Sequence, residues 1–172
     1  MTATSERTDL PGRFGAEYAG DDEHRPLAGY SILSTAFAGA FAGALIVALR
    51  RGRPLPDRIS TRDLVLAGIA THKVSRLVAK DKVTGFLRAP FTRFQERSGH
   101  GEVEEEARGR GLRRAVGELL ICPYCVGQWV AGGFTVGYVY APRLTRLLAG
   151  MWTMHAIADG LQLAYVAAED RV

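Results

Sequence analysis

A long uncharged stretch lies near the amino-terminal end of the chain. Residues Ser31 to Leu49 contain no charged side chain, and Arg50, Arg51 and Arg53 follow at once. A helix needs about 20 apolar residues to cross the hydrocarbon core of a bilayer, and cationic residues suit the headgroup region at its end. We therefore predict a first transmembrane helix over residues 30–50.

The average composition conceals this segregation of apolar and charged residues. The length of 172 residues fits a single domain. The mean hydropathy is −0.01 and the formal net charge is +4. Most Lys and Arg residues flank apolar segments or lie between them, an arrangement that suits anionic headgroups and membrane topology. The expected partner is thus the lipid bilayer, and nucleic-acid binding is not expected.

The rest of the chain divides into a polar tail, further apolar segments and one charged stretch. Residues 1–29 lack periodicity and are predicted to be a disordered tail. Helices are predicted near 63–80, 122–140 and 144–166, which makes the fold an all-α integral membrane bundle of about four helices, three to four of them spanning. Residues 81–121 carry charges of both signs. They are predicted to be a charged cytoplasmic loop, because the distribution of Lys and Arg favours cytoplasmic termini.

Two pairs of glycines have the G-x-x-x-G spacing, Gly39 with Gly43 and Gly133 with Gly137. Small residues one turn apart let a second helix approach closely. We expect this spacing to serve packing within the chain, and a homo-oligomer or a membrane protein partner is the alternative use.

Several polar residues are predicted to lie inside the membrane. Asp159 shares one face of the last apolar segment with His155 and Gln162. A lone charge at such depth is costly unless it is paired, so this face should point into the bundle. We predict an ion pair between Arg76 and Asp159, with His72 and His155 nearby.

The tetrapeptide Cys122-Pro123-Tyr124-Cys125 is the one constellation that suggests an activity. It is identical to the active-site motif of glutaredoxins, and a thiolate at a helix start would be stabilised, so the two cysteines are a candidate redox pair. As a zinc or iron site the pair would need further ligands, of which His155 is a candidate. As a structural element, Cys-Pro begins a helix and the small thiols pack against neighbours. The structural interpretation is favoured, and the other two stay open.

Four segments of the chain resemble one family. The sequence is similar, over about residues 63–166, to the small bacterial membrane proteins catalogued as domain of unknown function 1360. The segments that carry this resemblance are Arg76-Leu77, Lys80-Asp81-Lys82-Val83, Leu87-Arg88-Ala89-Pro90-Phe91 and Glu118 to Val130 (ELLICPYCVGQWV). The resemblance implies a multi-pass protein of the bacterial cytoplasmic membrane and transfers no reaction.

The chain has no complete set of nucleophile, base and orienting group that would identify an enzyme. We therefore expect a structural or partner-binding membrane component. The alternative is a membrane thiol redox or metal-binding protein that uses Cys122 and Cys125.

Overall fold

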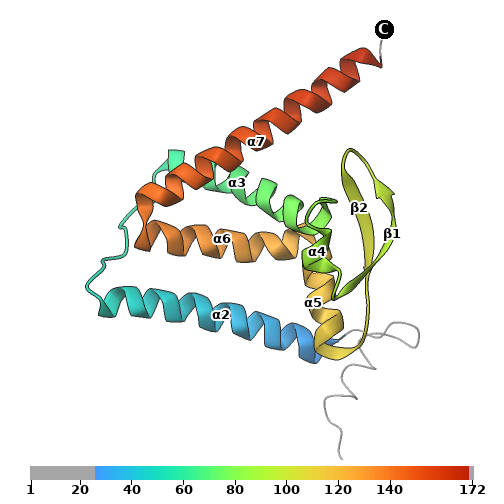
Figure 1. Cartoon of the computed structure of the whole chain (residues 1–172). Coiled ribbons are helices and arrows are strands. Elements are labelled where there is room, and N and C mark those ends of the chain that lie inside the picture. The colour runs from blue at the N-terminus through green and yellow to red at the C-terminus, as the bar shows by residue number, and fades with distance from the viewer. Residues whose placement is uncertain (1–25, 171–172) are drawn as a thin grey trace, which may run out of the picture.

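The computed structural model describes residues 26–170, so most of the predicted tail 1–29 lies outside the described residues. Four long helices and a small two-stranded sheet make up most of the fold (Figure 1). The elements in chain order are α2 (Leu27–Arg50), α3 (Thr61–Lys80), α4 (Gly85–Arg88), β1 (Thr92–Ser98), β2 (Glu102–Ala107), α5 (Gly111–Ile121), α6 (Pro123–Tyr140) and α7 (Pro142–Glu169).

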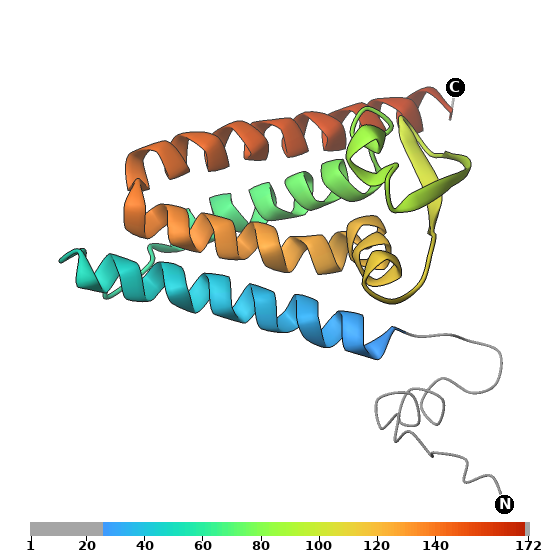
Figure 2. The same ribbon diagram turned by 60° about the horizontal axis from the view of Figure 1, so that its bottom comes forward.

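The four long helices alternate in direction and lie roughly side by side (Figure 2). Helix α3 packs against both α6 and α7, whereas α2 packs against α5 and α6 and so lies at the edge. The molecule thus has two ends. The hairpin end holds α4, β1, β2 and α5; the linker end holds the 51–60 linker and the turn between α6 and α7.

Local sequence explains where three of the long helices begin. The Ser60 hydroxyl accepts a hydrogen bond from the Asp63 N–H at 3.1 Å and so caps α3. Pro123 and Pro142 stand in the first turns of α6 and α7, where the missing N–H of proline has no helical partner to lose. Helices α5 and α6 meet at Cys122, the capping residue of α6, and the chain bends by 83° between them.

The interior between the helices is made of small residues. A Cβ built on Gly29 would lie 2.6 Å from the Cβ of Ala115, and one built on Gly132 would lie 2.9 Å from the ring of Phe37. The buried apolar residues are Ala48, Ala70, Ala79, Val103, Ala107, Ala115, Val126 and Ala149, and the largest side chain that is fully buried is that of Arg88.

The charged stretch 81–121, expected to be a loop, instead folds into α4, a β-hairpin and α5. Its strands are antiparallel, with Thr92 opposite Ala107. The turn depends on Gly99 and Gly101, which have φ values of +52° and +82° that residues with a Cβ rarely adopt. The all-α expectation is therefore corrected to a mostly helical fold with a two-stranded sheet.

One described helix, α2, is long and apolar enough to cross a membrane, or up to two spans are possible if the bent pair α5 and α6 counts as one. The expected three or four spans are thus not confirmed, because charged and polar residues lower the hydropathy of α3 and α7. The expected packing of Gly39 and Gly43 within the chain is wrong, since a Cβ at either position would meet no atom within 4 Å. Gly137 does pack, against Thr145.

Candidate functional site

The two cysteines lie at the bend between α5 and α6. Cys122 is the capping residue of α6, and its Sγ accepts a hydrogen bond from the Cys125 N–H at 3.3 Å. The two Sγ atoms are 2.7 Å apart, and both cysteines are free thiols. Cys125 and the neighbouring Tyr124 are exposed. The motif therefore presents an exposed thiol, Cys125, beside a partly exposed one, Cys122, at a helix start.

The structure does not join these thiols to the third metal ligand considered from the sequence. Within residues 26–170, no three His, Cys, Asp or Glu side chains form a group that could hold a metal ion. His155 lies on α7 beside Asp159, with 3.8 Å between Nδ1 and Oδ1. The cysteine pair thus supplies two ligands without a third from this part of the chain.

The predicted ion pair between Arg76 and Asp159 is wrong. Asp159 pairs with Lys73 of α3, and we call Lys73, His155 and Asp159 the α3–α7 cluster. Arg76 pairs with Glu102 of β2, through contacts of 2.9 and 2.6 Å. The partners differ because the packing register places Lys73 opposite Asp159, and because the hairpin offers Arg76 a carboxylate that a loop would not position.

Within residues 26–170, no hydrogen bond or ion pair joins the other two predicted members, His72 and Gln162, to the α3–α7 cluster. The side chains of His72 and Gln162 are exposed, and neither forms a hydrogen bond or ion pair within the described residues. Of the five polar residues, the structure brings together His155 and Asp159.

Two ion pairs fasten the end of α3 to the hairpin. Arg76 contacts Glu102, and Lys80 contacts Glu104 at 2.7 Å; we call these four residues the clasp. Residues four apart on a helix are about 6 Å apart along its axis, and residues two apart on a strand are about 6.8 Å apart. The two spacings nearly match, so basic residues on one face of α3 can each reach a carboxylate on one face of β2. The hydrogen bond from Lys80 holds the pKa of Glu104 below its ordinary value.

Arg88 forms a buried hub beside the clasp. Its Nε and Nη2 donate to the two carboxylate oxygens of Glu105 at 2.9 and 3.1 Å. Nη1 donates to the Val78 carbonyl at 2.6 Å and to the Thr84 hydroxyl at 2.8 Å, and Nη2 also donates to the Asp81 carbonyl at 2.9 Å. A guanidinium has five N–H donors, and all five have partners here. The hub therefore ties α3, α4 and β2 together.

The role of Arg88 is not apparent from the sequence. The segment Leu87-Arg88-Ala89-Pro90-Phe91 carries part of the family resemblance, and Glu105 stands within a run of glutamates. Nothing in that run distinguishes Glu105, whose side chain is 9% exposed, from its neighbours. The alternation of strand β2, with Val103 and Ala107 buried on either side of Glu105, is the signal that would have found it.

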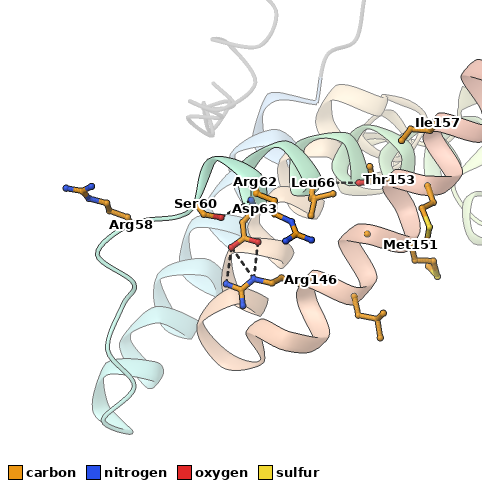
Figure 3. Close-up of a pocket in the computed structure, with 12 residues that line it drawn as sticks. Arg58, Ser60, Arg62, Asp63, Leu66, Arg146, Met151, Thr153 and Ile157 are labelled. Carbon is orange, nitrogen blue, oxygen red and sulfur yellow. Dashed lines mark hydrogen bonds and ion pairs between the residues drawn. The ribbon is translucent and has the colours of Figure 1, made fainter.

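A second polar site occupies the linker end, between α3 and α7. Arg146 of α7 contacts the carboxylate of Asp63 in three hydrogen bonds of 3.0 to 3.2 Å. The Arg146 guanidinium also lies 5.9 Å from the ring centroid of Tyr138. A cavity of about 670 Å³ opens beside this ion pair (Figure 3).

Comparison with known proteins identifies the family that the sequence resembles. Residues 66–165 match the family described as "Protein of unknown function (DUF1360)". The chain belongs to this family. The DUF1360 region contains the clasp, the hub, the two cysteines and the α3–α7 cluster, whereas α2 and Asp63 lie outside it.

Two relatives of this DUF1360 protein come from Bacillus subtilis (strain 168). UPF0713 protein YngL is 31% identical over 91 residues, which are 51% of this chain and 66% of that protein. Sporulation protein YjcA is 31% identical over 88 residues, which are 49% of this chain and 75% of that protein. The matched region thus spans just under two thirds of YngL. No solved structure matches the chain significantly.

Proposed function

We propose that this DUF1360 protein is an integral component of the bacterial cytoplasmic membrane. In this proposal α2, α3, α6 and α7 lie across the bilayer, and the hairpin end lies in water. Its role is to hold or recruit a partner within the membrane.

The observation that carries the proposal is the inverted distribution of large and small side chains. Leu147, Met154 and Leu161 of α7 are 66–69% exposed, whereas the buried residues between the helices are mostly alanine and glycine. Water-soluble proteins rarely expose apolar patches on this scale. Lipid-facing apolar side chains with small residues between the helices are typical of membrane bundles.

Helix α2 supports the same placement. The most apolar 18-residue stretch of α2 has a mean hydropathy of 2.2, yet only 6% of that stretch is buried. The core helix of a soluble protein would be mostly buried. Phe37 and Phe41 of α2 pack towards α6, where Phe37 contacts Trp129 edge to face with ring centroids 5.2 Å apart.

The lengths and charges of the other long helices are compatible with spanning. The four helices contain 18 to 28 residues, or about 27 to 42 Å at about 1.5 Å per residue, against a hydrocarbon core of about 30 Å. Charges in the middle of a bilayer need partners. Lys73 and Asp159 partner each other, whereas the clasp and the Asp63–Arg146 pair lie near the ends of the helices that carry them.

Cysteine labelling of the full chain in vesicles tests the four-span placement. In a Cys122→Ser, Cys125→Ser background, Asp57→Cys would report on the linker and Ser98→Cys on the hairpin. Four spanning helices would let an impermeant maleimide reach the two positions from opposite faces. Labelling of both from one face would show that α3 does not span, and release of the chain by alkaline carbonate would refute membrane integration.

The partner-binding role is supported by the open face of α2. A Cβ built on Gly39 or Gly43 would meet no atom within 4 Å in the described structure, and the spacing of the two glycines would let another helix approach closely. Crosslinking through Gly43→Cys, in the background without native cysteines, should trap a second copy or another membrane protein. Gly160→Cys, at an equally open glycine of α7, is the matched control, and equal crosslinking of both would contradict a specific face.

The cysteine pair supports a second candidate function, a membrane thiol oxidoreductase. The 2.7 Å separation of the two Sγ atoms places them close enough for a disulfide after a small movement. Forming it would release two electrons and two protons to an acceptor such as a quinone. Alkylation and mass spectrometry of the purified protein across a thiol redox titration should then show a reversible disulfide. Thiols that stay alkylatable throughout would exclude this function.

A further inference from the structure

The cavity at the linker end combines an apolar floor with a cationic mouth. It lies between α3 and α7, has a volume of about 670 Å³ and begins beside the ion pair of Asp63 and Arg146. Figure 3 shows Arg62 directed into the space beside this pair, with Leu66 and Thr153 further along the helices.

The mouth carries excess positive charge. Asp63 is the acidic residue among those that line the cavity, and its carboxylate is engaged by Arg146. Arg58 and Arg62 also line the cavity, and neither forms an ion pair within residues 26–170. Figure 3 shows the Arg62 guanidinium beside the ion pair, whereas the Arg58 side chain extends away from the cavity along the linker. The Arg62 guanidinium is thus available to an anion in the mouth, and such a group matches the geometry of a phosphate.

The floor of the cavity is a stripe along α7. Leu147, Met151, Met154 and Ile157 line it and are 43–69% exposed. Their spacing places them on one face of the helix. From Leu147 to Ile157 the stripe is about 15 Å long at about 1.5 Å per residue, close to half of a hydrocarbon core of about 30 Å. Its length therefore suits a single acyl chain in one leaflet.

From this combination we propose that the cavity is a binding site for an anionic phospholipid. The phosphate would contact Arg62, the nearby charge of Arg58 would add to the attraction, and one acyl chain would lie against the α7 stripe. This proposal rests on the membrane placement proposed above. A soluble anion would leave the stripe uncovered, and a zwitterionic lipid would supply less net charge to the mouth.

Native mass spectrometry of the detergent-purified full chain tests this site, with phosphatidylglycerol and phosphatidylcholine as the lipid probes. The parent chain should retain phosphatidylglycerol in preference to phosphatidylcholine. Arg58→Ala with Arg62→Ala should weaken phosphatidylglycerol retention about tenfold or more, since the second change removes a charge-assisted contact and the first removes a nearby positive charge. Arg51→Ala, a linker arginine that does not line the cavity, should leave it unchanged.

A second variant tests the apolar floor without touching charge. Gly150 lines the cavity, and a Cβ there would meet no atom within 4 Å, so Gly150→Leu should fill the groove and leave the fold intact. Gly160→Leu, at an equally open position outside the cavity, is its control. Retention lost in the first and kept in the second would support the site.

The outcomes separate this proposal from the membrane placement. Equal retention of both lipids, or full phosphatidylglycerol retention in the arginine and Gly150→Leu variants, would overturn the lipid site while the labelling experiment still supports spanning. Inorganic phosphate that displaces phosphatidylglycerol from the parent would assign the mouth to a free anion and would also overturn it. Failure of membrane integration would overturn both proposals.

Discussion

Arg88 is a fully buried cation in a protein whose other buried residues are mostly small. Burying a charge is costly unless it is paired and its hydrogen-bonding groups are satisfied. Here the pair with Glu105 neutralises the charge, and backbone carbonyls and the Thr84 hydroxyl take up the remaining donors. The side chain therefore acts as a rigid connector between three elements.

Replacing Arg88 should destabilise the hairpin end strongly. We expect Arg88→Met to lower the free energy of unfolding by about 3–5 kcal/mol, because the Glu105 carboxylate, whose side chain is 9% exposed, would lose its cationic partner. Thermal or SDS-induced unfolding in detergent measures the change. Arg93→Met, at an exposed position of β1, is the control and should be nearly neutral. An Arg88→Met effect no larger than the Arg93→Met effect would contradict the hub.

Two helical glycines differ in what surrounds them. A Cβ at Gly117 of α5 would lie 2.7 Å from the Phe91 carbonyl oxygen and 3.0 Å from the Cβ of Ala107, whereas one at Gly133 of α6 would meet nothing within 4 Å. Gly117→Ala should therefore cost about 1–3 kcal/mol by overpacking. Gly133→Ala should be neutral or stabilise by up to about 1 kcal/mol. The same unfolding assay compares them, and equal effects would mean that α5 does not pack this closely.

At the scale of elements, the clasp explains how a highly charged hairpin is held in place. Strand β2 uses both faces, since Glu102 and Glu104 bind the basic face of α3 while Val103, Glu105 and Ala107 point the other way. The charged residues that favour a loop in the sequence thus form the ion pairs that hold the hairpin against α3.

The clasp should make stability depend on pH on the acid side. The hydrogen bond from Lys80 lowers the pKa of Glu104 from its ordinary value of 4.5. A lowered folded-state pKa stabilises the fold at pH values above 4.5, and this contribution is lost as the pH falls through the folded-state pKa. The effect should be about 1 kcal/mol or less, since the Glu104 side chain is 42% exposed.

Melting temperature measured from about pH 6 to about pH 3 checks this expectation. The parent should lose more stability on acidification than Glu104→Gln, and Lys80→Met should resemble Glu104→Gln. Glu169→Gln, at the exposed end of α7, should follow the parent. Parallel curves for the parent and Glu104→Gln would rule out this contribution.

On the scale of the whole molecule, ion pairs join α7 to α3 at two separate positions along the helices. Asp63 and Arg146 join the helices at the linker end, and Lys73 and Asp159 join them further towards the hairpin end. Between these levels the Thr153 hydroxyl donates to the Leu66 carbonyl at 2.9 Å. These contacts set the register between the two helices, and four of the residues that make them, Asp63, Arg146, Leu66 and Thr153, line the proposed lipid site.

A double-mutant cycle tests the ion pair between Lys73 and Asp159. Lys73→Met and Asp159→Asn should each destabilise the chain, and the double variant should lose less than the sum, with a coupling of about 0.5–3 kcal/mol. Unfolding in detergent measures all three variants. Gln162→Ala, at an exposed position on the same helix, should show no coupling with Lys73→Met. Strict additivity of Lys73→Met and Asp159→Asn would refute the pair.

Features of this protein that depend on local chemistry were predictable from sequence alone. The uncharged stretch before Arg50 predicts an apolar helix, and α2 covers it. Proline at 123 and 142 starts α6 and α7, because a fixed φ and a missing N–H act on the nearest residues alone. The motifs shared with DUF1360 identified the family, since they too depend on residue types at fixed positions in the sequence.

The tertiary structure alone decided which charges meet. Lys73 and Arg76 lie one turn apart on α3, so helical periodicity offers either of them to Asp159. The choice depends on the register between α3 and α7, and on a hairpin that gives Arg76 another carboxylate. The burial of Arg88 likewise requires α3, α4 and β2 to converge. Ion pairs between distant segments depend on packing distances of a few ångströms, which the pattern of one segment cannot specify.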